Sequence, residues 1–464
     1  MSQILKKIKS YANNYLYMSD GFSEISGINS LTCEDSVVEF GECLASYWRS
    51  KSSIDKSLIV CYNHLIKTKG AIDMKRIECS CSRKFHQAPL EDMFISSGAI
   101  GQLPEILKGY KSIYLVADTR TYTVAGELCE RVLREAGMFS HKCILKGDIV
   151  LPNAETIGSI LLNAHDPSAK SDIFSYSPLP DLILAVGSGT INDSCRLASY
   201  RLQLPYAVVA TAPSMDGYAS AGSPILFNGS KATVQATTPK YIIADIDVVR
   251  EAPMEMMLAG IGDMFGKYTG LLDWELARDY TGEYYCEQIA GEVLDATNKC
   301  LENGYKLPQR DPECIRAIIE GLSVTGLGMA YIGNSRPASG AEHIVAHAWE
   351  LFDVERGNTP HLHGLEVCEA TRLVALMFQM LYRESDDLHL KTLIEKYLPY
   401  FEAIEAFCRT MKMPPTVSDR ETILAGIKRA LIMRDRYTVL FYLRDRGMLD
   451  DYAERATDAL LKVL

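Results

Sequence analysis

The pattern of apolar and polar positions divides the chain into parts of different character. From about Met93 to Ile246, short apolar runs rich in β-branched residues alternate with stretches whose apolar residues recur at helical spacing. The runs are SIYLVADT (112–119), HKCILKGDIV (141–150), DLILAVGSGT (181–190), YAVVATAPS (206–214) and YIIADIDVV (241–249), and the helical stretches include 122–137 and 154–166. This alternation predicts a parallel sheet with helices on its faces, in which ligands bind at the turns after the strands.

Beyond Glu251 the apolar residues keep helical spacing and β-rich runs become rare, which predicts an all-helical region. Its predicted helices cover residues 254–286, 313–329, 341–351 and 365–382. We therefore expect an α/β domain over residues 86–250 and an all-α domain over 251–464. Residues 1–85 form an extension that we expect to be helical, with helices over 37–49 and 58–67, and its role is not evident from the sequence.

Composition and charge narrow the class of protein. With 47% hydrophobic and 23% charged residues, the chain of 464 residues is typical of an ordinary globular protein. Its net charge of -11 disfavours nucleic acid and anionic membranes as partners, because no basic patch offsets the acidic excess. The N-terminus lacks the apolar stretch of a secretory signal, and no run reaches about 18 apolar residues, so we expect a cytoplasmic protein.

The 13 cysteines are an odd number scattered along the chain, which is typical of reduced thiols. Cys79, Cys81 and His86, in CSCSRKFH, suggest a zinc knuckle. Their spacing is unusual and the segment contains no fourth ligand, so the sequence disfavours that interpretation.

Two glycines follow the predicted strand that ends near residue 187. In AVGSGTINDSCR (185–196) they stand directly before a predicted helix, so backbone N–H groups and the positive end of the helix can meet a pyrophosphate without obstruction by side chains. The turn is not the complete GxGxxG motif, and a tight turn that binds nothing has the same glycines.

Polar side chains follow two other predicted strands. Asp118, in VADTRTY, is placed either to accept hydrogen bonds from an adenosine ribose or to cap the next helix. The loop TAPSMDGYASAG (211–222) is rich in hydroxyls and glycines and contains one carboxylate. From this loop we predict Thr211, Ser214 and Ser220 as cofactor contacts and Asp216 as a substrate contact.

Histidines recur at helical spacing in SGAEHIVAHAWE (339–350). His343 and His347 are four residues apart, so both can face one cavity, although Glu342 precedes the first histidine and the HExxH order of zinc proteases is absent. Together with His363 in HLHGLEV and Asp263 in AGIGDMFGKYTG, His343 offers a carboxylate and two imidazoles, a set suited to Zn²⁺, Ni²⁺ or Fe²⁺. Buried core histidines and an aspartate that caps a helix or forms an ion pair are the alternatives.

In combination, these motifs resemble the NAD(P)-dependent sn-glycerol-1-phosphate dehydrogenases, which share a superfamily with glycerol dehydrogenase, iron-dependent alcohol dehydrogenases and dehydroquinate synthase. The resemblance extends from about Phe94 to Val374. It is carried in order by AVGSGTINDSCR, TAPSMDGYASAG, ADIDVVREAP, AGIGDMFGKYTGLLDWELAR, SRPASGAEHIVAHAWE and HGLEV, and looks like the bacterial branch. It implies a dehydroquinate synthase-like fold, with an α/β Rossmann-like nucleotide-binding domain followed by an all-α metal-binding domain, and a homodimer.

The resemblance also implies roles for particular residues. Asp263, His343 and His363 would hold one divalent metal ion, and Asp216 would lie beside the substrate as a catalytic residue. His347 would be a neighbour of the ligands or face the substrate, and Lys267, one turn beyond Asp263, would bind a substrate phosphate unless it is a surface lysine. The residues expected to line NAD(H) or NADP(H) are Asp118, Gly187, Ser188, Gly189, Thr190, Ile191, Asp193, Thr211, Ala212, Pro213, Ser214 and Ser220.

The implied reaction is the reversible reduction of dihydroxyacetone phosphate to sn-glycerol 1-phosphate, in which hydride from the cofactor reaches a carbonyl polarised by the metal ion. A glycerol or polyol dehydrogenase is the nearest alternative. A cyclase of the dehydroquinate synthase kind is disfavoured because such enzymes carry glutamate where Asp263 stands, and iron-dependent alcohol dehydrogenases carry histidine at the position of Lys267. A catalytically silent binding protein is a further alternative from another class. Asp118 favours NAD, because a carboxylate there would repel a 2′-phosphate.

Overall fold

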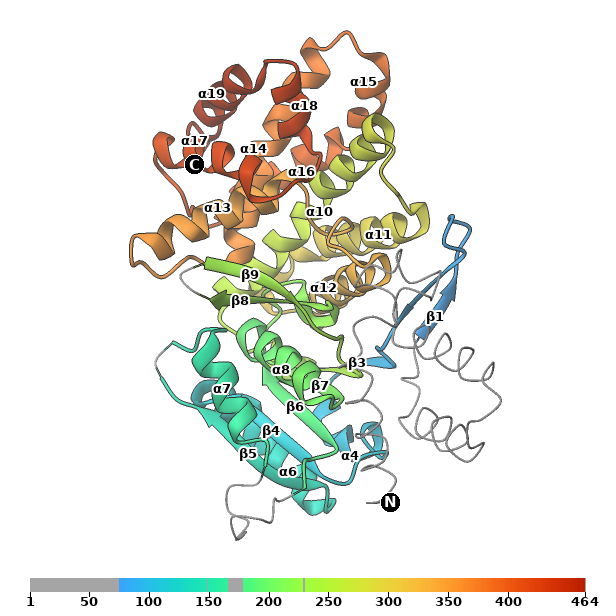
Figure 1. Ribbon diagram of the computed structural model, residues 1–464. Helices are drawn as coiled ribbons and strands as arrows, with labels where there is room; N and C mark the ends of the chain where they lie inside the picture. Colours follow the sequence, from blue (N-terminus) through green and yellow to red (C-terminus); the bar gives the residue numbers. More distant parts are fainter. Residues whose placement is uncertain (1–74, 148, 166–177, 228–229, 464) are drawn as a thin grey trace, which may run out of the picture. The chain divides into compact units, whose positions relative to one another are not determined.

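The structure is a computed structural model, and it describes residues 75–147, 149–165, 178–227 and 230–463. Six parallel strands form the principal sheet, in the order β3-β10-β7-β6-β4-β5 (Figure 1). They are β3 (Asp92–Ser96), β4 (Ile113–Asp118), β5 (Phe139–Leu145), β6 (Leu182–Gly187), β7 (Tyr206–Ala210) and β10 (Tyr241–Asp245). The central strands β6 and β7 are buried along their whole length, as a parallel sheet covered on both faces requires.

Successive residues of each strand enter two different apolar cores. Leu115 and Leu184 face a smaller core, whereas their neighbours Val116 and Ile183 face the large core that continues into the helical region. The helices that join or flank the strands are α4 (Leu103–Ile106), α5 (Thr119–Thr121), α6 (Glu127–Glu135), α7 (Ala154–Leu162), α8 (Gly189–Leu202) and α9 (Ile246–Val249). The predicted α/β region is thus confirmed.

The region after residue 250 is helical, as predicted. Its longest helix, α10 (Met254–Thr281), is buried along most of its length and packs on α14. The remaining helices are α11 (Glu287–Gly304), α12 (Pro312–Ile332), α13 (Ala341–Glu355), α14 (His363–Glu384), α15 (Leu388–Glu395), α16 (Leu398–Met411), α17 (Arg420–Met433), α18 (Val439–Asp445) and α19 (Leu449–Leu460). Residues 73–464 group as one unit by their contacts, and we propose a division near residue 250, where the last strand gives way to helices.

Among the described helices, α12 is the one long and apolar enough to cross a membrane by composition, and 61% of its most apolar window is buried inside the protein. It packs against α11 and α10. This apolar helix therefore belongs to the core of the fold.

The structure departs from the predicted elements in three places. YIIADIDVV is a strand only as far as Asp245, because that carboxylate accepts the N–H of Asp247 and starts the short helix α9. Residues 75–88 form the antiparallel hairpin of β1 (Lys75–Glu78) and β2 (Phe85–Ala88), so the described end of the expected helical extension is a hairpin instead. The helices predicted over 37–49 and 58–67 lie outside the described residues. A second hairpin, β8 (Gly222–Phe227) with β9 (Ser230–Gln235), follows the 211–222 loop and was not predicted.

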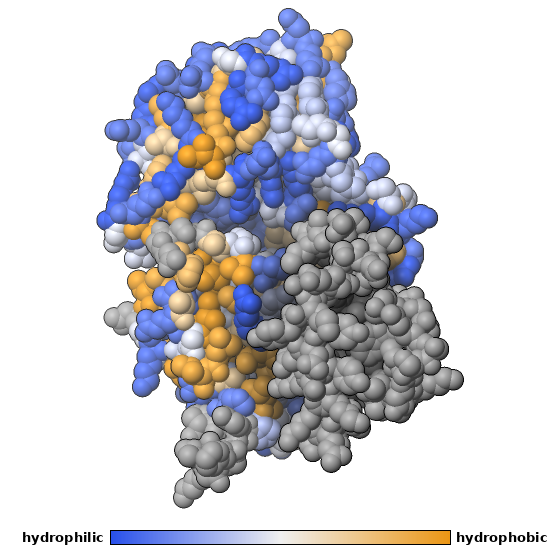
Figure 2. Space-filling view, in the orientation of Figure 1, coloured by the Kyte–Doolittle hydropathy of each residue, from blue (hydrophilic) through white to orange (hydrophobic). Residues whose placement is uncertain are grey.

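Apolar side chains also reach the surface. Figure 2 shows a broad apolar area over the part of the view where Figure 1 places α7, α8 and the strands beside them. Exposed apolar side chains of this part of the chain include Leu162, at the end of α7, and Phe227, at the end of β8. An apolar surface of this kind is typical of a protein–protein contact.

Gly260 brings α10 into direct contact with the 211–222 loop. A Cβ atom at this position would lie 1.8 Å from the carbonyl oxygen of Pro213, which is backbone and has no rotamer to change. We expect Gly260→Ala to displace the loop, to destabilise the fold by about 1–3 kcal/mol as overpacking does, and to lower activity. Thermal unfolding and steady-state kinetics measure the two effects.

Gly291, in the middle of α11, provides the matched control because an added Cβ would meet no atom within 4 Å. Alanine has the higher helix propensity, so Gly291→Ala should leave stability unchanged or raise it by roughly 0.5–1 kcal/mol. Equal thermal stability and activity in the two variants would show that the close approach of Gly260 to Pro213 does not constrain the loop.

Candidate active site

The predicted nucleotide turn lies between β6 and α8, at the carboxyl end of the sheet. Ser188 occupies the N-cap position and α8 begins at Gly189. A Cβ atom at Gly187 would lie 2.6 Å from the side chain of Ile191, so a larger residue there would disturb the start of the helix. The helix that begins here is 14 residues long, and its positive end faces the turn. This end of the helix favours the binding of a phosphate group.

The 211–222 loop runs beside this turn. The N–H of Thr211 donates to the carbonyl of Gly187 at 3.3 Å, and the hydroxyls of Ser188 and Ser214 lie 2.6 Å apart. Ser188 also donates to the carbonyl of Ala212 at 3.2 Å. The structure thus brings the two predicted cofactor segments together. Ser220, by contrast, hydrogen-bonds to Gly222 of its own loop.

Asp118 ends β4, the neighbour of β6 in the sheet. Its carboxylate accepts the N–H groups of Arg120 and Thr121, each at 2.8 Å, and the Thr121 hydroxyl accepts the N–H of Asp118 at 3.0 Å. This is a complete capping box, so the helix-capping alternative describes what Asp118 does in this structure.

The three predicted metal ligands come from three helices. Asp263 lies in α10 and is fully buried, His343 lies in α13, and His363 is the first residue of α14. Each offers a ligand atom within 4.8 Å of the others. The Nε2 atom of His343 faces Asp263 Oδ1 at 3.2 Å. These donors are close enough to bind one ion together.

Two carboxylates orient the imidazoles. Nδ1 of His343 lies 2.7 Å from Glu342 Oε1, and Nδ1 of His363 lies 2.5 Å from Glu350 Oε1. A carboxylate beside Nδ1 holds the ring proton there and leaves the Nε2 lone pair for a metal ion, which is the usual arrangement of metal-ligating histidines. The donor set and its orientation therefore fit one divalent cation.

Lys267 is buried among these groups. Its ammonium group donates to Asp216 Oδ2 at 2.6 Å and to Asp263 Oδ1 at 2.8 Å, and it lies 3.5 Å from His343 Nε2. The possibility of a surface lysine is therefore wrong. Although burial raises the pKa of Asp263, the charge of Lys267 and the hydrogen bond of His343 outweigh it and hold that pKa well below its usual range. The Asp263 carboxylate is consequently ionised, as a metal ligand must be.

The loop and the metal ligands are joined directly. The backbone N–H of Asp216 donates to Asp263 Oδ2 at 2.8 Å, and the side chains of both residues meet Lys267. Contacts therefore run from the turn at Gly187 through Thr211, Ser214 and Asp216 to Asp263 in α10.

Comparison with known proteins gives a consistent result. Residues 94–253 match the family model described as iron-containing alcohol dehydrogenase. The glycerol-1-phosphate dehydrogenase [NAD(P)+] of Halalkalibacterium halodurans is 35% identical over 321 residues, which cover 68% of this chain and 77% of that protein. The chain belongs to the glycerol-1-phosphate dehydrogenase family. The enzyme of the same name from Bacillus subtilis is also 35% identical, over 65% of this chain and 76% of its own length.

The fold of this member of the glycerol-1-phosphate dehydrogenase family is shared with more distant enzymes. The crystal structure of glycerol dehydrogenase from Schizosaccharomyces pombe covers 84% of this chain and 91% of its own, with a TM-score of 0.58 and 16% sequence identity. The family resemblance and the fold predicted from the sequence are both confirmed.

A buried ion pair joins Asp193 and Arg196. Both residues belong to the nucleotide motif of this glycerol-1-phosphate dehydrogenase family member. The Arg196 guanidinium also donates to the backbone carbonyls of Gly217 and Gly222 and to the Tyr206 hydroxyl. Asp193, which was predicted as a cofactor contact, is thus paired with Arg196. The arginine stabilises the 211–222 loop by hydrogen bonds to its backbone carbonyls. The sequence motif did not indicate this role.

His347 lies beside the two histidine ligands. Its ring centroid is 6.4 Å from that of His343 and 5.1 Å from that of His363, on which it stacks. Ligand atoms of His347, Glu350 and His363 also lie within 4.8 Å of one another, so His347 borders the site beside His363. Whether it contacts substrate remains a prediction.

Two acidic residues were not identified from the sequence. Glu350 follows His343 by seven residues, which is two helical turns, so helical spacing could have placed it on the same face. Asp273 carries no such signal. It accepts the N–H groups of Ala341 at 2.7 Å and Val439 at 2.6 Å, which anchors the start of α13, while burial and Glu342 raise its pKa to about 7.

Proposed function

We propose that this chain is a metal-dependent, NAD(P)-linked sn-glycerol-1-phosphate dehydrogenase that reversibly reduces dihydroxyacetone phosphate. The observation that carries the proposal is the hydrogen bond from the Asp216 N–H to Asp263 Oδ2, which sets the loop after β7 directly against the metal ligands. A cofactor bound along that loop would thereby be delivered to the metal site. The relatives named above carry this activity in their names.

The turn after β6 and the adjoining loop would bind the cofactor. The N-terminus of α8 offers backbone donors and a positive field to the pyrophosphate. Ser188, Thr211 and Ser214 add hydroxyls beside it. Asp118 caps the next helix through its Oδ1 atom, and the other oxygen of its carboxylate would face the adenosine ribose and favour NAD(H) over NADP(H).

Asp263, His343 and His363 would hold the divalent metal ion, which the sequence suggests is zinc, nickel or iron. When both are bound to the protein, the metal ion supplies Lewis acidity toward a carbonyl and the nicotinamide cofactor supplies hydride. The carboxylates beside the Nδ1 atoms would keep both imidazoles in the metal-binding tautomer, and Asp263 and His343 are themselves buried.

Asp216 and Lys267 would manage the proton that the reduction requires. They are joined at 2.6 Å, so a proton that the ammonium group gives to the substrate oxygen would be replaced by one that the Asp216 carboxylate first takes up from solvent. Lys267 would also be the partner of a substrate phosphate, which would then displace one of the two carboxylates that its ammonium group holds. His347, at the border of the site, would contact the far end of that substrate.

The direct test is to follow the loss of NADH absorbance with metal-supplemented protein and either dihydroxyacetone phosphate or dihydroxyacetone. Rapid oxidation of NADH with the phosphate alone, followed by identification of the sn-1 product, supports the proposal. Preference for the unphosphorylated ketone would instead indicate a polyol dehydrogenase. Tight NADH binding with no turnover on either ketone would indicate a binding protein.

We expect Asp216→Asn to retain the metal ion while turnover falls by about 10²–10⁴-fold, the usual contribution of a general acid or base. The amide keeps the size of the side chain but carries no charge for Lys267 and takes up no proton. Metal content and kcat measured on the same sample separate the two properties. An unchanged kcat would remove Asp216 from the mechanism.

We also propose a homodimer in the cytoplasm. The apolar surface over α7 and α8 in Figure 2 supports an interface there. Light scattering on the purified protein, with charged substitutions at Leu162, tests the assembly: a monomer produced by those substitutions places the interface on α7.

A further inference from the structure

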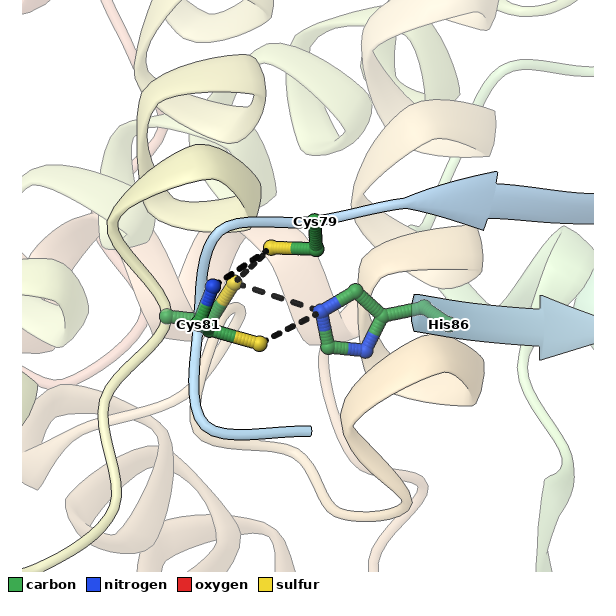
Figure 3. Close-up of side chains that lie close together, drawn as sticks. Cys79, Cys81 and His86 are labelled. Atoms are coloured by element: carbon green, nitrogen blue, oxygen red, sulfur yellow. Dashed lines mark hydrogen bonds between the residues drawn. The ribbon is translucent and has the colours of Figure 1, made fainter. Parts of the chain in front are cut away.

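Four potential metal ligands meet at the hairpin of β1 and β2, on elements that do not form the active site. Cys79 and Cys81 lie in the turn between the strands and His86 lies in β2. Figure 3 shows their sulfur atoms and the imidazole ring pointing toward one another. The fourth ligand, which the local sequence lacks, is Cys286, about two hundred residues along the chain and directly before α11.

The distances among these atoms are those of a tetrahedral zinc site. With Zn–S bonds of about 2.3 Å and Zn–N bonds of about 2.0–2.1 Å, ligand atoms are separated by about 3.8 Å between sulfurs and about 3.5 Å between sulfur and nitrogen. The sulfurs of Cys79 and Cys286 are 3.5 Å apart, and His86 Nε2 lies 3.5 Å from the Cys81 sulfur and 3.3 Å from that of Cys286. All four atoms lie within 4.8 Å of one another.

His86 is held in the tautomer that binds metal. Its Nδ1 lies 3.3 Å from the backbone carbonyl of Tyr331, at the end of α12. A carbonyl accepts and does not donate, so the ring proton belongs on Nδ1 and the Nε2 lone pair faces the sulfurs. The side chain is 2% exposed, so this orientation is fixed by packing.

Donors surround the sulfurs as they do around bound thiolates. The Tyr284 hydroxyl donates to the Cys81 sulfur at 3.2 Å, and the N–H of Cys81 donates to the Cys79 sulfur at 3.5 Å. Cys286 is the N-cap of α11, so its sulfur lies at the positive end of a helix of 18 residues.

The thiols differ in their readiness to ionise. Burial raises the pKa of the Cys81 thiol, but hydrogen bonds from Tyr284, Cys79 and the Arg83 backbone outweigh it and lower that pKa to about 6. Burial raises the pKa of Cys286 to about 12. A bound metal ion deprotonates its thiol ligands outright, which removes the difference.

We propose that Cys79, Cys81, His86 and Cys286 bind a structural zinc ion that joins the β1–β2 hairpin to the start of α11. Four protein ligands close the coordination sphere, as in structural rather than catalytic zinc sites. The hairpin already contacts α12 through β2 and through a hydrogen bond from the Arg83 guanidinium to the Ile332 carbonyl at 2.7 Å, and the ion would add a link to the start of α11. The ion would therefore fix the hairpin to the helical region.

The test must separate this ion from the one at the active site. The double variant His343→Ala/His363→Ala removes two active-site ligands and leaves the cysteine cluster intact. We expect elemental analysis of this full-length variant to find one zinc per chain. Adding Cys79→Ser and Cys81→Ser should reduce zinc from one per chain to none, whereas adding Cys314→Ser, a cysteine of α12 outside the cluster, should leave it at one.

Cobalt substitution provides a second measurement that does not depend on the cysteine variants folding. Co²⁺ bound by three thiolates in the double histidine variant should show a sulfur-to-cobalt charge-transfer band and the intense visible bands of tetrahedral cobalt. Weak octahedral bands only, the absence of bound metal, or a Cys79–Cys286 disulfide in the mass spectrum of the unreduced protein would each overturn the proposal.

Discussion

Replacement of His343 by alanine is expected to abolish metal binding at the active site and catalysis together while the protein stays folded. His343 is one of the three proposed protein ligands, and its Nε2 atom lies 3.2 Å from Asp263 Oδ1 while the Glu342 carboxylate holds the other side of the ring. Loss of a single stabilising donor costs a catalytic site roughly 10²–10³-fold. Loss of the ion removes more, so we expect a decrease in kcat of at least about 100-fold.

Two further variants complete this test. His361 is exposed and stands two residues before His363, so His361→Ala should retain both metal and activity. Glu342→Gln keeps every ligand but weakens the hold on His343 Nδ1, and should lower metal affinity by about 10–100-fold. Full activity after exhaustive chelation, with the metal content measured on the same sample, would overturn the metal assignment.

The proposed metal donors were accessible from the sequence because helical spacing and residue chemistry both pointed to them. His343 and His363 are histidines with no local structural reason to occur where they do, and Asp263 lies in a glycine-rich helix. What orients them was less accessible. Glu350 reaches His363 from a different helix, and Asp273 anchors α13 through backbone contacts that leave no pattern in the sequence.

The strands and helices were predicted where one periodicity persisted over a whole element, as in β6 and α10. They were missed where a single side chain decided the outcome. Asp245 ends β10 by capping α9, and no change in hydrophobic pattern marks that position. The second hairpin begins at Gly222, whose carbonyl accepts a hydrogen bond from the Arg196 guanidinium. We attribute the position of the hairpin to this contact, because Arg196 lies 26 residues earlier, in α8.

Long-range assembly accounts for the remaining differences. The three ligands at the β1–β2 hairpin looked incomplete because Cys286 is remote in sequence, although it lies 3.3 Å from His86 Nε2 in space. In the same way, the spacing of four residues placed Lys267 one turn beyond Asp263, but nothing in the sequence revealed that Asp216 would meet the same ammonium group. A local pattern identifies the chemistry of a residue, and only the fold supplies its partners.

Lys267 leads to the second large effect. Its ammonium group pairs with two buried carboxylates, and removing one partner of a buried pair usually costs about 3–5 kcal/mol because the other charge stays buried and unpaired. We therefore expect Lys267→Met to lower the melting temperature of the metal-free protein strongly. A divalent ion bound by Asp263 restores positive charge to the same carboxylate, so added metal should raise the melting temperature of the variant more than that of the parent.

Lys396 provides a matched control for this effect. Its ammonium group lies 2.8 Å from Glu275, the same separation as between Lys267 and Asp263, but its side chain is 54% exposed whereas that of Lys267 is fully buried. Glu275 is itself buried, but without Lys396 it keeps the Tyr397 hydroxyl at 2.8 Å and the Arg278 guanidinium at 3.7 Å, so Lys396→Met should change the melting temperature little, with or without metal. If the melting temperature fell equally in the two variants, burial of the lysine would not determine how much its ion pair contributes to stability. A Lys267→Met protein whose melting temperature stays low when it is loaded with metal would contradict this explanation. The bound ion would then not replace the positive charge that Asp263 loses with Lys267, so the ion and the lysine would not serve the same carboxylate.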